Sequence, residues 1–311
     1  MSGWQLLDAY LDDLTARGYQ PTSVLSKRLW IIRFRRFCHE RFGLKDAAAV
    51  TAAHAEQYQQ ALRWELGRHG KLLSQNTVGY ATAQVRCFYR WAVRRCLLLV
   101  NPFEDTVLPR LPIVPRRLLS VAEVEILLSG PDLLKPTGLR DRALLETMYS
   151  AGLRRAECQR LNVEDAQLSD LVLIVRGKGS VTRHQPIGPM LAATLAMYLR
   201  DARPQLSCNS SEPAFFIGEW GKRLVPGSIN ALVSRYGRQT GLGKVSPHLL
   251  RHAYGSHLLA NGATLEEVQR LLGHQLIGST QTYTHITQEQ LAQGHRRAHP
   301  RARRRRPPTA P

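Results

Sequence analysis

The sequence predicts a mainly helical protein with two domains, an all-helical N-terminal domain and an α+β domain that holds one small antiparallel sheet. Three observations indicate this fold class. Apolar residues recur at helical spacing through residues 4–98, three prolines stand within seven residues at 109–115, and a β-branched run at 171–175 precedes a glycine-flanked turn. With 311 residues, of which 43% are hydrophobic, the chain is long enough for two domains with cores of their own.

The N-terminal domain, expected at 1–108, contains four amphipathic helices. Apolar residues follow one another at intervals of three or four in each, and basic residues occupy much of the remaining surface. The expected helices span residues 4–14, 24–42, 51–66 and 76–98. Thr51 can cap the third helix. Asn101-Pro102 ends the fourth, because a residue before proline disfavours the helical conformation.

The prolines predict a stiff, extended linker at 109–118. The α+β domain follows at 119–290, and residues 291–311 form a C-terminal helix and a basic tail. The strands of the α+β domain are expected at 171–175 and 182–187, joined by the turn Gly177-Lys178-Gly179. Helices are expected at 120–128, 139–150, 189–200, 226–240, 247–261, 265–272 and from 288 onward, the first opened by the capping-box pattern Ser120 to Glu123.

The chain is strongly basic, with a formal net charge of +19. The surplus is spread along the chain, and residues 296–311 alone contain seven arginines and no acid. Such a distribution suits a protein that contacts a polyanion, above all a nucleic acid, through more than one part. From charge alone, a solvated basic surface or a ribosome-associated protein is the alternative.

Five cysteines without a C-x-x-C pair indicate buried thiols in a reducing cytosol rather than disulfides. No apolar run is long enough to span a bilayer, and the first residues lack the shape of a signal peptide. We therefore expect a cytoplasmic protein without a membrane partner.

The residues that indicate function follow a fixed order of arginine, lysine, histidine with an arginine three residues later, histidine and tyrosine. They are Arg154, Lys178, His248, Arg251, His274 and Tyr283. No fold needs this set for stability, whereas the attack of a tyrosine hydroxyl on a phosphodiester does require it. The two arginines can stabilise the charge that builds on the non-bridging phosphate oxygens. Tyr283 is the only nucleophile of the set.

Proton transfer falls to the remaining members. The leaving 5′-oxygen needs a proton, and Lys178, at the tip of the hairpin, could reach into a groove to supply it. His248 and His274 can donate hydrogen bonds to phosphate oxygens or help to move a proton. A tyrosine ester conserves the bond energy, so no metal, nucleotide or other cofactor is expected.

Each residue also has a purely structural interpretation. Arg154 and Glu157 lie three apart and could form a pair on a helix surface. His248 and His252 have a spacing that also suits zinc, although no nearby cysteine or acid completes a ligand set. The others could be ordinary residues of a turn, a helix end or a core, Tyr283 among them. The complete set in this order favours the functional interpretation.

Five motifs support a family resemblance. They are Gly152-Leu153-Arg154-x-x-Glu157, Arg176-Gly177-Lys178-Gly179, Pro247-His248-x-x-Arg251-His252, Leu271-Leu272-Gly273-His274 with Thr282-Tyr283-Thr284-His285, and the ending His299-Pro300-Arg301-Ala302. Residues 76–102 are also similar to the last helix and exit of a core-binding domain. Over nearly its whole length the sequence resembles a tyrosine recombinase of the phage-integrase superfamily, and most of all the Xer-type recombinases.

The resemblance implies a SAM-like core-binding domain and a catalytic domain on opposite faces of duplex DNA. It implies that the six residues are catalytic, with Glu157 in support, through a 3′-phosphotyrosyl intermediate. It also implies a tetramer on two recombination sites, built from this chain alone or with a sister recombinase, in which the helix from about Gln288 docks on a neighbour. A septal DNA translocase is an implied further partner. The expected DNA-binding residues are Lys27, Arg28, Arg35, Arg86, Arg90 and Arg94.

The predicted function is site-specific recombination of DNA, in an Xer-like resolution of chromosome or plasmid multimers. Three alternatives stay open. A mobile-element integrase or transposase would use the same chemistry, a type IB topoisomerase would relax DNA without exchanging strands, and a DNA-binding regulator would have lost catalysis. The six filled positions argue against the regulator.

Overall fold

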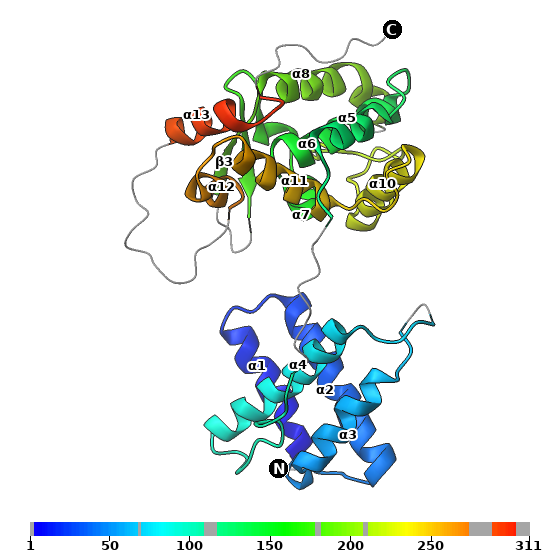
Figure 1. Ribbon diagram of the computed structural model, residues 1–311, viewed down its shortest axis with the longest axis vertical. Helices are drawn as coiled ribbons and strands as arrows, with labels where there is room; N and C mark the ends of the chain where they lie inside the picture. The colour runs from blue at the N-terminus through cyan, green and yellow to red at the C-terminus, as the bar shows by residue number, and fades with distance from the viewer. Residues whose placement is uncertain are drawn as a thin grey trace. The chain divides into compact units, whose positions relative to one another are not determined.

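The computed structural model describes residues 3–67, 70–108, 117–177, 182–207, 211–273 and 288–302 (Figure 1). Contacts divide the chain into two compact units, Met1–Pro115 and Arg116–Pro311. The described residues are mainly helical, with one three-stranded antiparallel sheet, which confirms the predicted fold class. None of the described helices is both long and apolar enough to cross a membrane.

The described part of the first unit packs its helices around an aromatic core. The helices are α1 (Leu6–Ala16), α2 (Pro21–Phe42), α3 (Ala52–Arg63) and α4 (Gln75–Arg94), with short 3₁₀ turns at η1 (Gly3–Gln5) and η2 (Ala47–Ala49). The Phe34 ring is fully buried, with ring centroids 4.8 Å from Tyr58 and 5.1 Å from Phe103. Helix α2 begins at Pro21, earlier than expected, because the first position of a helix tolerates a residue without an N–H.

The second unit surrounds a buried central helix. Its helices are α5 (Val121–Ser129), α6 (Pro136–Ser150), α7 (Arg155–Arg160), η3 (Val163–Asp165), α8 (Pro189–Met197), the π-helical η5 (Tyr198–Ala202), α9 (Arg203–Leu206), α10 (Pro226–Gln239), α11 (Pro247–Ala260), α12 (Leu265–Leu271) and α13 (Gln288–Ala298). Helix α6 is buried along most of its length and contacts α5, α7, α8 and α11 (Figure 1). The capping box is confirmed, since Ser120 and Glu123 exchange hydrogen bonds at the start of α5.

The sheet has the order β1-β2-β3, with β1 (Ala166–Gln167), β2 (Val172–Arg176) and β3 (Thr182–Pro186). Strands β2 and β3 pair in antiparallel orientation, as predicted. The two-residue β1 is too short for a periodic pattern to reveal. Val175 pairs with Arg183 and Leu173 with Gln185. Directly opposed residues share one face of a sheet, so Arg183 and Gln185 lie on the same face as the buried Leu173 and Val175.

The end of the described chain packs on the second unit. Helix α13 contacts α11, α12 and β3. The implied docking of this helix on a neighbour stays a prediction. Within the chain the segment buries two histidines and an arginine, since His295 and His299 have 0% exposure and Arg301 has 2%. A helix with such a face is stable only where that face is covered.

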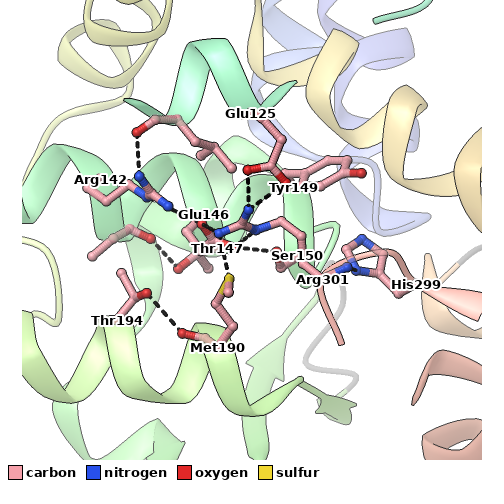
Figure 2. Close-up of polar contacts among 12 residues, drawn as sticks. Glu125, Arg142, Glu146, Thr147, Tyr149, Ser150, Met190, Thr194, His299 and Arg301 are labelled. Carbon is pink, nitrogen blue, oxygen red and sulfur yellow. Dashed lines mark hydrogen bonds and ion pairs between the residues drawn. The ribbon is translucent and has the colours of Figure 1, made fainter. Parts of the chain in front are cut away.

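Arg301 is held by two carboxylates (Figure 2). Its Nη1 donates to both oxygens of Glu125, at 2.8 and 2.7 Å. Its Nη2 donates to Glu146 Oε2 at 2.8 Å, and its Nε donates to Glu146 Oε1. Glu146 lies in the buried α6, so this ion pair joins the last described segment to the centre of the unit.

Candidate active site

The candidate site begins at the turn between α6 and α7. Gly152 has a φ of +60°, in the left-handed region that favours glycine. A Cβ at this position would lie 2.4 Å from Cδ1 of Tyr254, so no larger residue fits without movement. The turn places Arg154 immediately before the first residue of α7.

Glu157, in the first turn of α7, is the acceptor around which the site is arranged. Its Oε2 accepts the backbone N–H of Arg154 at 2.7 Å, and its Oε1 accepts Nη1 of Arg154 at 2.9 Å. The interpretation of this pair as a helix-surface contact is wrong, because Glu157 is only 5% exposed.

Arg251 approaches the same carboxylate from α11. Ser246 caps this helix by accepting the N–H of Leu249 at 3.3 Å. The largely buried guanidinium of Arg251 donates from Nη1 to the carbonyl of Gly152 at 2.5 Å, and the same Nη1 lies 3.8 Å from Glu157 Oε2. The two arginines expected to stabilise a phosphate thus meet at one acid.

The turn after α12 closes one side of the cluster. The carbonyl of Leu272 accepts Nη2 of Arg251, and the carbonyl of Gly273 accepts Nη2 of Arg154 at 3.3 Å. Gly273 has a φ of +60°, as expected for a residue that ends a helix. It is also the residue before His274 in the sequence, so the Leu-Leu-Gly motif contributes backbone acceptors to the arginines.

A third arginine, which the sequence did not single out, completes the cluster. Arg183 on β3 donates from Nη1 and Nη2 to the two oxygens of Glu157, at 2.9 and 3.0 Å. Its Nε donates to Gln185 Oε1 at 3.3 Å. Their spacing shows only that Arg183 and Gln185 share a face of the expected strand; that this face turns inward follows from the pairing of β3 with β2.

The charges in this cluster stabilise one another, since the arginines surround the Glu157 carboxylate. Burial raises the pKa of Glu157, but hydrogen bonds and the charge of Arg183, followed by those of Arg154, outweigh it and bring that pKa to about 2. Burial, and then the charge of Arg154, lower the pKa of Arg251 to about 10. Glu157 and Arg251 are therefore both ionised near neutrality. Three guanidiniums lie around this one carboxylate.

Of the six predicted catalytic residues, the structure describes three. Arg154 and Arg251 come together at Glu157, while His248 lies exposed in the first turn of α11. The other three, Lys178, His274 and Tyr283, lie outside the described residues. Across the described ranges no group of three or more His, Cys, Asp or Glu side chains could hold a metal ion.

The predicted DNA-binding residues of the first unit divide among different pockets. Lys27, Arg90 and Arg94 line one pocket of about 430 Å³. Arg28 lines a second pocket and Arg35 a third. The structure therefore gathers three of the six predicted residues at one place.

Some of these cations also bind within their own unit. Nη2 of Arg86 donates to the carbonyl of Thr106, and Lys27 donates to Gln84 Oε1 at 2.7 Å. Arg90 lies 3.7 Å from Glu104 in an exposed ion pair. Exposed pairs of this kind are weak, so Arg90 can exchange its partner readily.

Comparison with known proteins supplies the family. The phage integrase family matches residues 117–290, and the N-terminal SAM-like domain of phage integrases matches residues 6–97. The chain is 38% identical over 297 residues to tyrosine recombinase XerC 2 of Ralstonia nicotianae, across 94% of this chain and 85% of that protein. It is 33% identical over 298 residues to tyrosine recombinase XerD of Pseudomonas putida, across 95% and 97%. A lambda integrase tetramer bound to a Holliday junction shares the fold, with a TM-score of 0.66 and 18% identity across 88% of this chain and 78% of that one.

The chain belongs to the phage integrase family, which matches both of its units. It is a site-specific tyrosine recombinase, an enzyme that cuts and rejoins DNA. The family, the enzyme class and the fold predicted from the sequence are confirmed.

Proposed function

We propose that Arg154 and Arg251 bind the scissile phosphodiester and that Tyr283 attacks it to form a 3′-phosphotyrosyl bond. The supporting observation is that two guanidiniums, one immediately before α7 and one on α11, are held at Glu157 by contacts within the protein. Each guanidinium has five N–H donors, so donors remain for phosphate oxygens after the bonds within the protein are made. Donors that are already in place cost no reorganisation when charge develops in the transition state.

In the proposed reaction the Tyr283 oxygen bonds to phosphorus while the bond from phosphorus to the 5′-oxygen breaks. Lys178 gives a proton to the leaving 5′-oxygen, and His248 and His274 donate hydrogen bonds to the phosphate or accept the tyrosine proton. A 5′-hydroxyl from another strand then attacks the phosphotyrosyl bond and releases the tyrosine. One phosphodiester is made for each one broken, so the exchange needs no nucleotide.

Substitution of either arginine separates catalysis from binding. Because one charge-stabilising donor is worth roughly 10²–10³ in rate, Arg154→Ala or Arg251→Ala should slow covalent adduct formation by about that factor. Affinity should change little, since it rests on many phosphate contacts. The substrate is a nicked DNA duplex. Its sequence is selected from a randomised pool by covalent capture on the unaltered protein, and the same duplex is then used for every variant. A parallel fall in affinity and cleavage would contradict the assignment.

The biological role proposed is Xer-like resolution of chromosome or plasmid multimers, by a tetramer of this chain alone or with a sister recombinase. The similarity to XerC and XerD proteins over almost the whole chain supports it. We include control by a septal DNA translocase in this proposal. Sequencing of DNA fragments trapped covalently in cells should recover one recurrent chromosomal or plasmid site. Recovery of the two ends of a mobile element would favour the integrase alternative instead.

For the first unit, we propose that Lys27, Arg90 and Arg94 contact phosphates, with Arg28 and Arg35 in further contacts. Their shared pocket supports the first three. Each lost phosphate contact should lower the salt dependence of binding by about 0.9 in the logarithmic slope. Arg94→Ala should show this change, whereas Arg86→Ala, which removes a bond to Thr106, should lower stability more than the slope.

A further inference from the structure

Arg183 has no role in the chemistry described above, yet its side chain makes two hydrogen bonds to Glu157, where the side chain of Arg154 makes one. Arg183 presents two parallel N–H donors to the two carboxylate oxygens, a two-point geometry available to arginine and not to lysine. Its side chain is only 18% exposed. With Nε on Gln185 and both terminal nitrogens on Glu157, the guanidinium faces the protein rather than solvent.

The same guanidinium also lies against the turn after α12. A Cβ on Gly273 would stand 3.1 Å from Cζ and Nη1 of Arg183, so the backbone and the guanidinium are in close contact. The carbonyl of Gly273 in turn accepts Arg154 Nη2. Arg183 thus touches both groups that orient Arg154, the carboxylate on one side and the glycine turn on the other.

We propose that Arg183 is a positioning residue for strand cleavage, which fixes the Glu157 carboxylate and thereby the guanidiniums of Arg154 and Arg251. The inference rests on the proposed function, in which those two arginines bind the scissile phosphate. Without the two N–H donors of Arg183, the Glu157 carboxylate can rotate about its last torsion angle. Arg154 and Arg251 then lose the fixed acceptor that orients them both. A displacement of the catalytic groups by about 1 Å can cost about 100-fold in rate.

The experiment measures covalent adduct formation on the selected nicked duplex at saturating protein. Arg183→Gln should slow the step by about 10- to 100-fold. Affinity for the duplex should change by less than about twofold, because all three nitrogens of the guanidinium are directed at Glu157 and Gln185. Arg183→Lys retains the charge but only one contact point, and should recover part of the rate. The matched control is Arg223→Gln, which removes a partly buried arginine that binds the carbonyls of Gln159 and Leu161 at the far end of α7. It should cleave at the unaltered rate.

A double-mutant cycle separates positioning from other roles. If Arg183 acts through Glu157, the double variant Glu157→Gln, Arg183→Gln should be no slower than Glu157→Gln alone. Losses that multiply would overturn the proposal, because Arg183 would then act independently. Equal loss in the Arg223 control would also overturn it, as a general effect of removing a buried arginine.

The pH profile gives a readout that a loss of folding would not mimic. Burial raises the pKa of Glu157 and Arg183 is the main group that lowers it. The acid limb of the cleavage rate should therefore move to higher pH in Arg183→Gln, and partly return in Arg183→Lys. An unchanged limb in a folded, DNA-binding variant would contradict the proposal. Arg154→Ala is run beside them: if it cleaves normally the proposed function fails, whereas if it is inactive and Arg183→Gln is normal only this inference fails.

Discussion

Gly152 lies so close to the ring of Tyr254 that a methyl group on the glycine would overlap it, at 2.4 Å from Cδ1. The contact joins the turn that precedes Arg154 to the helix that carries Arg251. Gly152 therefore allows the turn and the helix to approach closely. Its carbonyl also accepts a hydrogen bond from Arg251.

Gly152→Ala should consequently disturb both arginines at once. We expect a loss of stability of about 1–3 kcal/mol from the left-handed backbone, increased by the clash, and a fall in cleavage larger than the fall in DNA affinity. Gly262→Ala is the control, because Gly262 also has a positive φ, at +85°, but nothing lies within 4 Å of its Cβ position. Urea unfolding and adduct formation measure the two effects. Equal behaviour of the two variants would refute the importance of the Tyr254 contact.

Tyr283→Phe removes the proposed nucleophile and keeps the ring. Covalent adducts on the nicked duplex should disappear, while the affinity for that duplex should remain. Denaturing gel electrophoresis after incubation measures the adduct. Adducts of normal yield with the phenylalanine variant would assign the nucleophile elsewhere.

Lys178→Ala should be slow only where the leaving oxygen needs a proton. A duplex with sulfur in place of the bridging 5′-oxygen has a leaving group that departs without protonation. We expect the variant to be strongly impaired on ordinary DNA and largely rescued on the sulfur-containing duplex. Arg154→Ala serves as the comparison that the sulfur does not rescue. Lack of rescue for Lys178→Ala would give the lysine another role.

The docking of α13 should weaken in mild acid. Burial lowers the pKa of His295 to about 4; burial, followed by the charges of His295, Arg301 and His257, lowers that of His299 well below its ordinary 6.5. The unfolded segment takes up protons below pH 6.5 that the docked one refuses, so docking is most stable above pH 6.5 and loses stability as pH falls towards 4. Tyr149 and Tyr254 also pack on this pair.

Hydrogen exchange of α13, corrected for intrinsic rates, should show lower protection at pH 5 than at pH 7.5. His295→Gln keeps an N–H donor for the carbonyl of Ser150, which His295 contacts at 2.9 Å, but does not titrate. It should therefore show a smaller difference between the two pH values. Equal protection at both pH values in the unaltered protein would disprove the coupling.

Arg301→Met should destabilise the second unit strongly. The substitution leaves Glu146 buried with only part of its compensation, and removal of one member of a buried ion pair costs about 3–5 kcal/mol. Adding Glu146→Gln should restore part of the loss, since the buried carboxylate charge is removed; the recovery is partial because the buried Arg142 then loses its 3.4 Å ion pair with Glu146. Arg297→Met is the control, because its 3.5 Å pair with Glu267 involves an arginine side chain that is 60% exposed and should cost less than about 1 kcal/mol. Equal costs for Arg301 and Arg297 would refute the buried-pair account.

The sequence predicted the helices and the hairpin well, because their apolar periodicity is local information. Two helices begin earlier than predicted, at Pro21 and Pro136. Proline at the first helical position extends each helix beyond its apolar pattern. The contiguous motifs also indicated that Arg154, Glu157 and Arg251 belong to one site, and the structure brings these three side chains together. The sequence remains the sole basis for Lys178, His274 and Tyr283, which stay predictions.

Two features could not be predicted from local patterns. Arg183 gains its place only from the register of β3 against β2, which depends on pairing between strands rather than on spacing within one. The basic residues near the end of the chain suggest a solvated segment, yet Arg301 is buried because two acids, Glu125 and Glu146, meet it from distant helices. Burial of a charge is decided by its partners, and partners far away in sequence leave no periodic signal.

The ion pair of Arg301 with Glu146 also bears on the order in which the second unit folds during synthesis. Translation places Glu146 in the folding unit long before residue 301 leaves the ribosomal exit tunnel, so a nascent chain lacks the cation that makes burial of this acid favourable. We expect the catalytic unit to complete its core only after Arg301 has emerged. A chain that ends before Arg301 would leave Glu146 buried without this cation and should unfold more readily than the full chain.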